Sequence, residues 1–221
     1  MTLSCSVSDD GVPISGTSSR SSSTVYLNWS KVSGPGDVVF DAASSAFVPP
    51  NRTNSVSARA SFSAGGVYVL RLTASDGGSS VSDDVQVDVN EPPVVNAGAD
   101  QLISIPALSV TLDGIATDDG RPLNMLLYSW SKVSGPGSVA FTNTATLNTR
   151  ANFSTNGVYV LRLTAGDTSV VVYDDIQVIV NAAPVVNAGA DQVVTLPSTL
   201  ALNGAATDDG VPIDALTTVW S

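Results

Sequence analysis

Apolar and polar residues alternate along several short stretches of the chain. The run VYVLRLTA at residues 158–165 places every second residue on one side, and residues 175–180 repeat this alternation. Strict alternation is typical of a β-strand with one buried face. Turn signals such as GPG, DDG, SDGG and TNG separate the runs, and no segment keeps a helical period. The pattern predicts short strands. In the first, one of two alternating sets faces the core, either Tyr159, Leu161 and Leu163 or Val160, Arg162 and Thr164. In the second, Ile176, Val178 and Val180 point inward.

The same motifs recur along the chain. PPVVNAGADQ at residues 92–101 returns as APVVNAGADQ at residues 183–192, and GVYVLRLTA occurs at residues 66–74 and 157–165. The motif WSKVSGPG begins at Trp29 and again at Trp130. A DDG triplet lies near the end of three related segments, which finish at Pro13, Pro122 and Pro212. A period of about 90 residues indicates repeated whole domains rather than a solenoid of short repeats.

Short strands at regular spacing within one such repeat predict a two-sheet sandwich. By analogy with that fold, strand B covers residues 110–116, strand C contains Trp130, and strand G runs over residues 175–180. Strands E and F meet at residues 153–159, where Tyr159 follows a glycine and occupies the place of a tyrosine corner. The sequence therefore predicts an all-β protein of tandem immunoglobulin-like β-sandwich domains.

The repeat boundaries predict one complete domain between two partial ones. Residues 1–90 form a domain that lacks its first strand, residues 91–181 form a complete domain, and residues 182–221 form the N-terminal part of a third. Partial sandwiches would leave apolar faces open and strand edges unpaired. We favour an excerpt of a longer repetitive chain. The alternative is a subunit whose incomplete ends complete each other head to tail by strand addition.

Charge restricts the classes of partner. The chain has 20 acidic and 9 basic residues, and its formal net charge is -11. Such a chain cannot neutralise a run of phosphates, so nucleic acid and anionic membrane surfaces are excluded as partners. No apolar run is long enough to span a bilayer, and no signal peptide is visible at the start. A divalent cation is the partner that this charge balance favours.

Cysteine, histidine and tryptophan argue for structure rather than catalysis. The chain has one cysteine and no histidine, so it forms no internal disulfide and lacks the commonest general base. Cys5 aligns with Gly114 on strand B, where we expect a small buried hydrophobe. Trp29, Trp130 and Trp220 stand at equal places in strand C, so we interpret them as core anchors rather than sugar-stacking surfaces. Carboxylate pairs occur in every repeat, which is improbable for a glycosidase site.

The runs WSKVSGPG, VAF, ANFSTNGVYVLRLTAGD and DDIQVIV closely resemble the PKD and PKD-like repeats of bacterial surface and secreted proteins. The resemblance covers essentially the whole chain and implies an immunoglobulin-like sandwich. Members of the family serve as spacers, adhesion modules and accessory domains of secreted hydrolases, and some bind calcium. One departure is that WSKVSGPG stands where many PKD domains have WDFGDG. This departure puts any role tied to the GDG loop in doubt.

Acidic residues gather in the loops that a sandwich brings to one end. Several carboxylates at one pole repel each other unless an ion bridges them, and Ca²⁺ takes 6–8 oxygen ligands. The resemblance supports Asp118, Asp119 and Asp167 as calcium ligands. The full predicted set of metal ligands is Asn96, Asp118, Asp119, Asp167, Asp9, Asp10, Asp76, Asp208 and Asp209. The alternative is turn chemistry, in which Asp binds its own backbone and Gly supplies a positive φ.

Two classes of function remain open. The linkers at residues 90–94 and 181–185 are short and contain proline, which predicts domains joined end to end with limited swing. The first hypothesis is a non-catalytic structural or adhesive array, such as a stalk, surface layer or filament, with neighbouring copies or repeats as partners. The second is an accessory carbohydrate-binding or spacer module of a secreted hydrolase, with surface polysaccharide as partner. Near-identical repeats favour the first, on the surface of a bacterial cell.

Overall fold

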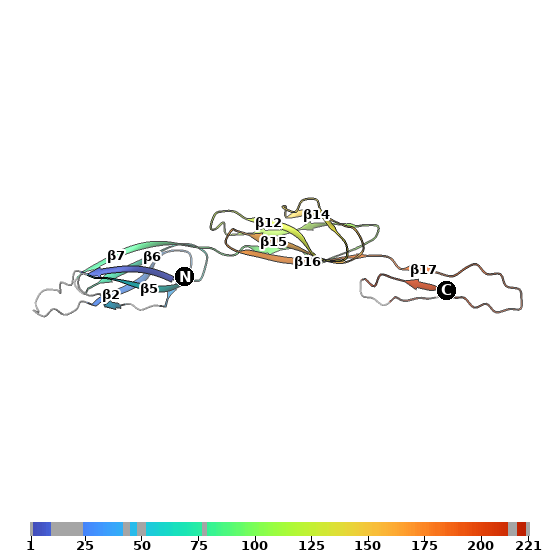
Figure 1. Cartoon of the computed structure of the whole chain (residues 1–221), viewed down its shortest axis with the longest axis horizontal. Helices are drawn as coiled ribbons and strands as arrows, with labels where there is room; N and C mark the ends of the chain where they lie inside the picture. Colours follow the sequence, from blue (N-terminus) through green and yellow to red (C-terminus); the bar gives the residue numbers. More distant parts are fainter. Residues whose placement is uncertain are drawn as a thin grey trace, which may run out of the picture. The chain divides into compact units, whose positions relative to one another are not determined.

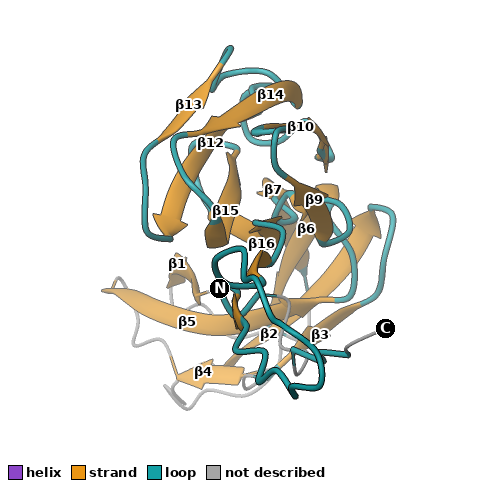
Figure 2. Ribbon diagram, turned by 90° about the vertical axis from the view of Figure 1, so that its right-hand side faces the viewer, coloured by secondary structure: helices purple, strands orange, loops and turns teal. Residues whose placement is uncertain are grey.

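The computed structural model describes residues 2–9, 24–41, 45–47, 52–76, 79–211 and 216–219. Within these ranges every regular element is a β-strand, as Figure 2 shows, and no helix is long or apolar enough to cross a membrane. The chain divides into two compact units. Unit 1 contains Met1–Glu91 with Asp119–Met125, and unit 2 contains Pro92–Asp118 with Leu126–Ser221. The prediction of tandem all-β sandwich domains is confirmed, whereas the three sequence-based domain boundaries stay a prediction.

Unit 2 contains a two-layer sandwich (Figure 1). One layer is the four-stranded sheet β12-β15-β16-β9, and the other combines β10-β14-β13 with the short pair β11-β8. The strands are β8 (Val94–Asn96), β9 (Gln101–Ser104), β10 (Ser109–Asp113), β11 (Ile115–Thr117), β12 (Leu127–Ser134), β13 (Val139–Phe141), β14 (Asn148–Phe153), β15 (Gly157–Gly166) and β16 (Val171–Asn181). The N-terminal segment of the second repeat contributes a strand to each layer, because β8 pairs with β11 and β9 runs parallel to β16.

The core of this sandwich confirms the alternation read from the sequence. Ile176, Val178 and Val180, which were predicted to point inward, are buried, and the buried set of β15 is Tyr159, Leu161 and Leu163. Trp130 is also buried, at 2% exposure. The Trp130 indole N–H donates to the Leu147 carbonyl at 3.0 Å, so its polar atom is paired as well. Burying side chains of this size contributes about 2–3 kcal/mol each. Trp130 is therefore a core anchor, as predicted.

The predicted strand over residues 110–116 is interrupted. Gly114 separates β10 from β11, and its N–H donates to the Leu147 carbonyl at 3.2 Å, in the register that pairs β10 with β14. A Cβ atom at this position would lie 2.6 Å from Leu163 and 3.0 Å from the Trp130 ring. A glycine allows the backbone to approach the tryptophan this closely. The first repeat has Cys5 at the same place, within an unbroken strand.

Unit 1 contains the sheets β1-β5-β3 and β4-β2-β6-β7. Its strands are β1 (Thr2–Asp9), β2 (Thr24–Ser33), β3 (Val38–Phe40), β4 (Ser45–Phe47), β5 (Arg52–Phe62), β6 (Gly66–Ser75) and β7 (Ser80–Val89). Trp29 is only partly buried and stacks on Phe40 with a centroid distance of 6.2 Å. Cys5, which was expected to be a small buried hydrophobe, is half-buried and packs against Val7, Val25 and Leu27.

The last repeat contributes one strand pair among the described residues. β17 (Val185–Asn187) pairs antiparallel with β18 (Ala205–Thr207), in the register that β8 and β11 share in the preceding repeat. Val185 and Val186 are 67% and 74% exposed, so this pair covers no apolar core. Trp220 lies outside the described residues.

The WSKVSGPG motif closes each tyrosine corner. The Tyr159 hydroxyl donates to the Thr155 carbonyl at 2.9 Å, as the predicted corner requires. Gly135 has a φ of 130°, and its backbone packs closely against this ring. A Cβ atom at this position would lie 2.3 Å from the ring's Cδ1. The Lys132 ammonium donates to the carbonyls of Gly135, at 2.8 Å, and Gly137, and lies 5.8 Å from the centre of the tyrosine ring. The motif therefore builds a packed turn.

We expect Gly135→Ala to destabilise unit 2 by about 3 kcal/mol, because it combines backbone strain with a steric clash against Tyr159. The measurement is urea unfolding followed by tryptophan fluorescence in a Trp29→Phe, Trp220→Phe background, where only the buried Trp130 reports. Ser134→Ala, at the neighbouring exposed position, is the control. Equal midpoints for the two variants would contradict this account of the turn.

Candidate functional site

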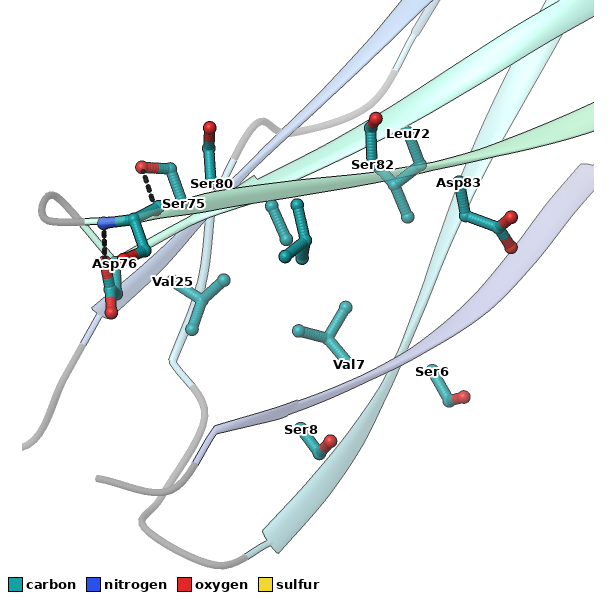
Figure 3. A pocket seen from close by; sticks show the side chains of 13 residues that line it. Ser6, Val7, Ser8, Val25, Leu72, Ser75, Asp76, Ser80, Ser82 and Asp83 are labelled. Atoms are coloured by element: carbon teal, nitrogen blue, oxygen red, sulfur yellow. Dashed lines mark hydrogen bonds between the residues drawn. The ribbon is translucent and has the colours of Figure 1, made fainter. Parts of the chain in front are cut away.

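The predicted ligands in the hairpins β6–β7 and β15–β16 serve as turn acceptors. Asp167 is fully buried, and its Oδ1 accepts the N–H groups of Ser169 at 2.8 Å and Val170 at 2.7 Å. Asp76 stands at the same place in unit 1, and its Oδ1 accepts the Ser79 N–H at 2.7 Å (Figure 3). Both residues show the turn chemistry that the sequence offered as an alternative to calcium.

Asn96 belongs to the segment that crosses between the layers of unit 2. Its Oδ1 accepts the N–H of Gly98 at 2.7 Å, which forms a tight side-chain turn. Between them, the N–H of Ala97 donates to Asp174 Oδ2 at 2.8 Å. This bond satisfies the amide of a residue that is fully buried in the core. Asn96 therefore helps to shape the segment that Asp174 holds.

The first linker is tied to the DDG loop of the second repeat. Asp119 Oδ2 accepts the N–H of Glu91 at 3.4 Å, and its Oδ1 accepts the N–H of Arg121 at 2.9 Å. The Glu91 carboxylate in turn accepts the N–H of Gly65 at 2.7 Å. The Arg121 guanidinium bonds to the Asp88 carboxylate and lies 3.8 Å from Asp119. All five residues belong to unit 1.

The second linker repeats this arrangement within unit 2. Asp209 Oδ2 accepts the N–H of Ala182 at 2.9 Å and the side-chain amide of Asn156 at 2.7 Å, while its Oδ1 accepts the N–H of Val211 at 3.1 Å. These bonds, led by the one from Ala182, lower the pKa of Asp209 below its usual value. Among the contacts seen, the neighbouring Asp208 accepts one hydrogen bond, from the Gly210 N–H at 3.2 Å.

The two linkers share one contact, which we call the linker tether. In each, the second aspartate of DDG accepts the N–H of the linker's second residue, giving the pairs Asp119–Glu91 and Asp209–Ala182. The sequence pattern predicted these aspartates as metal ligands, and the hydrogen bonds that they accept from the linker N–H groups were missed. The available signal was a DDG triplet after each linker at nearly the same separation, 28 residues from Glu91 to Asp119 and 27 from Ala182 to Asp209.

Asp175, an acidic residue of β16, takes part in an ion pair. Asp175 forms a two-pronged ion pair with Arg162, at 2.7 and 2.8 Å, and the arginine hydrogen bond lowers the pKa of the carboxyl. Arg71 and Asp84 form the same pair in unit 1. Asp175 is therefore paired across strands rather than placed in a cluster of carboxylates.

Calcium remains a prediction. Among the residues that the structure describes, no group of three or more Asp, Glu, His or Cys side chains is placed to hold a metal ion. Asp118 directly follows β11, and Asp9 ends β1 with its side chain outside the described part. Asp10 also lies outside the described residues. The seen contacts of Asp119 and Asp209 are to N–H donors, so these two carboxylates serve as hydrogen-bond acceptors in the structure.

We expect the backbone amide of Ala182 to report the titration of Asp209. The bonds lower the folded-state pKa of this carboxyl, so they persist above the ordinary aspartate pKa and are lost as the pH falls through the lowered value. The measurement is a pH titration of the Ala182 amide resonance, which should move only below about pH 4. Asp209→Ala should abolish this step and speed amide exchange at Ala182.

The Gly189 amide is the internal control, because its acceptor is the side chain of Asn187, which does not titrate. An Ala182 resonance that does not respond to acid in the wild-type chain would contradict the second linker tether.

Residues 97–180 match the family described as K319L-like, PKD domain. The human dyslexia-associated protein KIAA0319 is 32% identical over 159 residues, which cover 65% of this chain and 14% of the relative. The mouse KIAA0319-like protein is 32% identical over 156 residues, with 65% and 15% covered. The chain therefore matches only a small part of these relatives' length. Both relatives are mammalian, so the expected bacterial origin gains no support.

Two solved PKD domains are also similar to the chain. The solution structure of the PKD domain from KIAA 1837 protein has 27% identity and a TM-score of 0.34, covering 45% of this chain and 92% of that domain. The PKD domain of human KIAA0319 has 19% identity and a TM-score of 0.36, covering 46% and 88%. The resemblance noted in the repeated motifs thus has an independent counterpart: residues 97–180 match the K319L-like PKD domain family.

Proposed function

We propose that this chain is a non-catalytic structural or adhesive array that joins sandwich domains end to end. The observation that supports this most directly is the linker tether, because the same backbone contact recurs at both linkers. A free linker residue retains conformational entropy worth about 1–2 kcal/mol. Tying its amide to a carboxylate reduces that freedom where one domain passes into the next.

The acidic residues suit this role better than a catalytic one. Retaining glycosidases need two carboxyl groups about 5–5.5 Å apart on either side of a substrate cleft. Here the second aspartate of each DDG accepts backbone N–H groups, and Asp119 also has Arg121 beside it. The N–H groups that bond to Asp209 lower the pKa of its carboxyl, which makes it a poor proton donor. Both aspartates are well suited to fix loops.

We propose an extracellular or cell-surface location for the array. The proposal is supported by the PKD-type match of residues 97–180 and by the PKD resemblance of the repeats around them. Neighbouring copies or repeats of the chain are its proposed partners. An accessory module that binds surface polysaccharide is the competing function, and retention of the chain on an insoluble polysaccharide would favour it.

We expect Asp119→Ala to widen the distribution of distances between spin labels placed on the two units. Labels at Ser57 and Ser131, both exposed, in a Cys5→Ser background suit double electron–electron resonance. Loss of the first linker tether should broaden the distribution, because the linker residue regains its conformational freedom. Asp113→Ala removes an exposed aspartate of β10 and serves as the control. Equal widths in wild type and Asp119→Ala would remove the basis of the proposed array.

Calcium at the acidic loops is a further proposal, supported by the repeated aspartates and by the net charge of -11. Extracellular calcium modules bind with dissociation constants of about 0.1–1 mM. We expect calcium at about 10 mM, compared with chelator, to stabilise the chain by about 1.4 kcal/mol, since the ion would be tenfold above such a constant. Differential scanning calorimetry measures the shift, with magnesium at equal ionic strength as control. Superimposable transitions would contradict calcium binding.

A further inference from the structure

Three asparagines of the chain lie in the sequence Asn-X-Ser/Thr, in which X is any residue except proline. They are Asn28, Asn51 and Asn152. This sequence is the acceptor for N-linked glycans in secreted proteins. Asn51 lies outside the described residues, whereas Asn152 belongs to β14, within the sandwich of unit 2. Its surroundings can therefore be compared with what an attached glycan requires.

The side chain of Asn152 points away from the core. Its neighbours along β14, Ala151 and Phe153, are 0% and 4% exposed, and successive residues of a strand face opposite sides of a sheet. Asn152 itself is exposed. The Phe153 ring packs on Tyr159 inside the sandwich, on the other side of the strand. A group attached to the side-chain nitrogen of Asn152 therefore extends into solvent and leaves this packing unchanged.

The strands on both sides of β14 leave room for a sugar at this position. Asn152 stands opposite Ser109 of β10 and Ala140 of β13. Residues in such positions have Cβ atoms about 4.5–5.5 Å apart, so a bulky side chain at either place would cover the asparagine. Serine and alanine are too short to do so. The surface around Asn152 is open on both sides.

The hydrogen bonds of the acceptor sequence are compatible with a glycan. The Nδ2 atom of Asn152 donates to the Ala140 carbonyl at 3.2 Å. A side-chain amide has two N–H groups, and glycosylation uses one of them, so the other can keep this bond. Ser154 completes the acceptor sequence; it is exposed, and its Oγ accepts the Ser138 N–H at 2.9 Å. The folded strand can thus hold the modified side chain in its present orientation.

The sandwich does not need an asparagine at this position. Residues 60–66 of the first repeat, ASFSAGG, align with residues 151–157, ANFSTNG, so Ser61 stands in place of Asn152. Ser61 lies in β5, which forms the equivalent strand. The first repeat has an acceptor elsewhere, at Asn28 of β2, where the second repeat has Ser129. A requirement of the fold therefore accounts poorly for Asn152.

We propose that Asn152 is the attachment site of an N-linked glycan. A bond forms between its Nδ2 atom and the anomeric carbon of a lipid-diphosphate-linked sugar donor. The bond from that carbon to phosphate breaks, the lipid diphosphate leaves, and the amide loses one proton to a base of the transferase. The inference rests on the proposed extracellular location. The glycan covers the outer face of the sheet β10-β14-β13, so neighbouring copies of the array would have to meet through other surfaces.

The first test expresses the whole chain behind a cleavable leader peptide in animal cells, with Asn28→Gln and Asn51→Gln so that Asn152 is the one acceptor left. Peptide N-glycosidase converts a glycosylated asparagine to aspartate, which mass spectrometry locates in the tryptic peptide of residues 151–162. We expect this conversion at residue 152. Ser154→Thr keeps the hydroxyl and should keep the glycan, whereas Ser154→Ala should lose it.

A chain without a glycan, whether secreted or retained in the cell, would overturn the proposal, as would equal modification of Ser154→Ala. A chain that carries the glycan but is retained in the cell would support the site and count against the extracellular location. The two failures are therefore distinguishable.

The second test determines whether the glycan lies outside the sandwich. The glycosylated chain and the same chain trimmed to its first sugar by an endoglycosidase should unfold at the same urea concentration, because a side chain that faces solvent buries no part of the glycan. Asn152→Gln, which cannot be modified, is the control for loss of the asparagine. A lower midpoint for the intact glycan than for the trimmed one would overturn the outward placement.

Discussion

The fold of the second repeat depends on a segment that crosses from one layer of the sandwich to the other. β8 pairs with β11 in one layer, and β9 runs parallel to β16 in the other. Between them Ala97 is buried in the core, where an unpaired backbone N–H would cost about 1–3 kcal/mol. Asp174 supplies the acceptor at this point, and because it is a carboxylate the bond is stronger than a neutral one. The crossing closes one end of the core and sets the position from which the linker enters.

The same chemistry explains why so many aspartates occur in a chain with few lysines and arginines. Asp167 receives two backbone N–H groups, Asp209 receives two together with a side-chain amide, and Asp100 receives one. Each of these aspartates fixes a turn, a strand or a linker through the N–H groups that it accepts, and in Asp209 these bonds lower the pKa of the carboxyl. The negative charge of the molecule is in this sense a consequence of using side-chain oxygens where loops and linkers have no ladder partners. A calcium ion at the same loops would have to share these oxygens with the amides.

The parts of the fold that follow from periodicity could be predicted, and the parts that follow from individual contacts could not. Alternation predicted both strands and the inward face of β16, and the glycine at position 157 located the tyrosine corner, because both are local patterns with one physical meaning. The break at Gly114 depends on how closely the backbone approaches Trp130, which no local pattern encodes. The sequence predicted the DDG aspartates as metal ligands and not as part of the linker tethers for a similar reason. A DDG triplet is compatible with a turn, an ion or a tether, and only the position of the linker amide distinguishes among them.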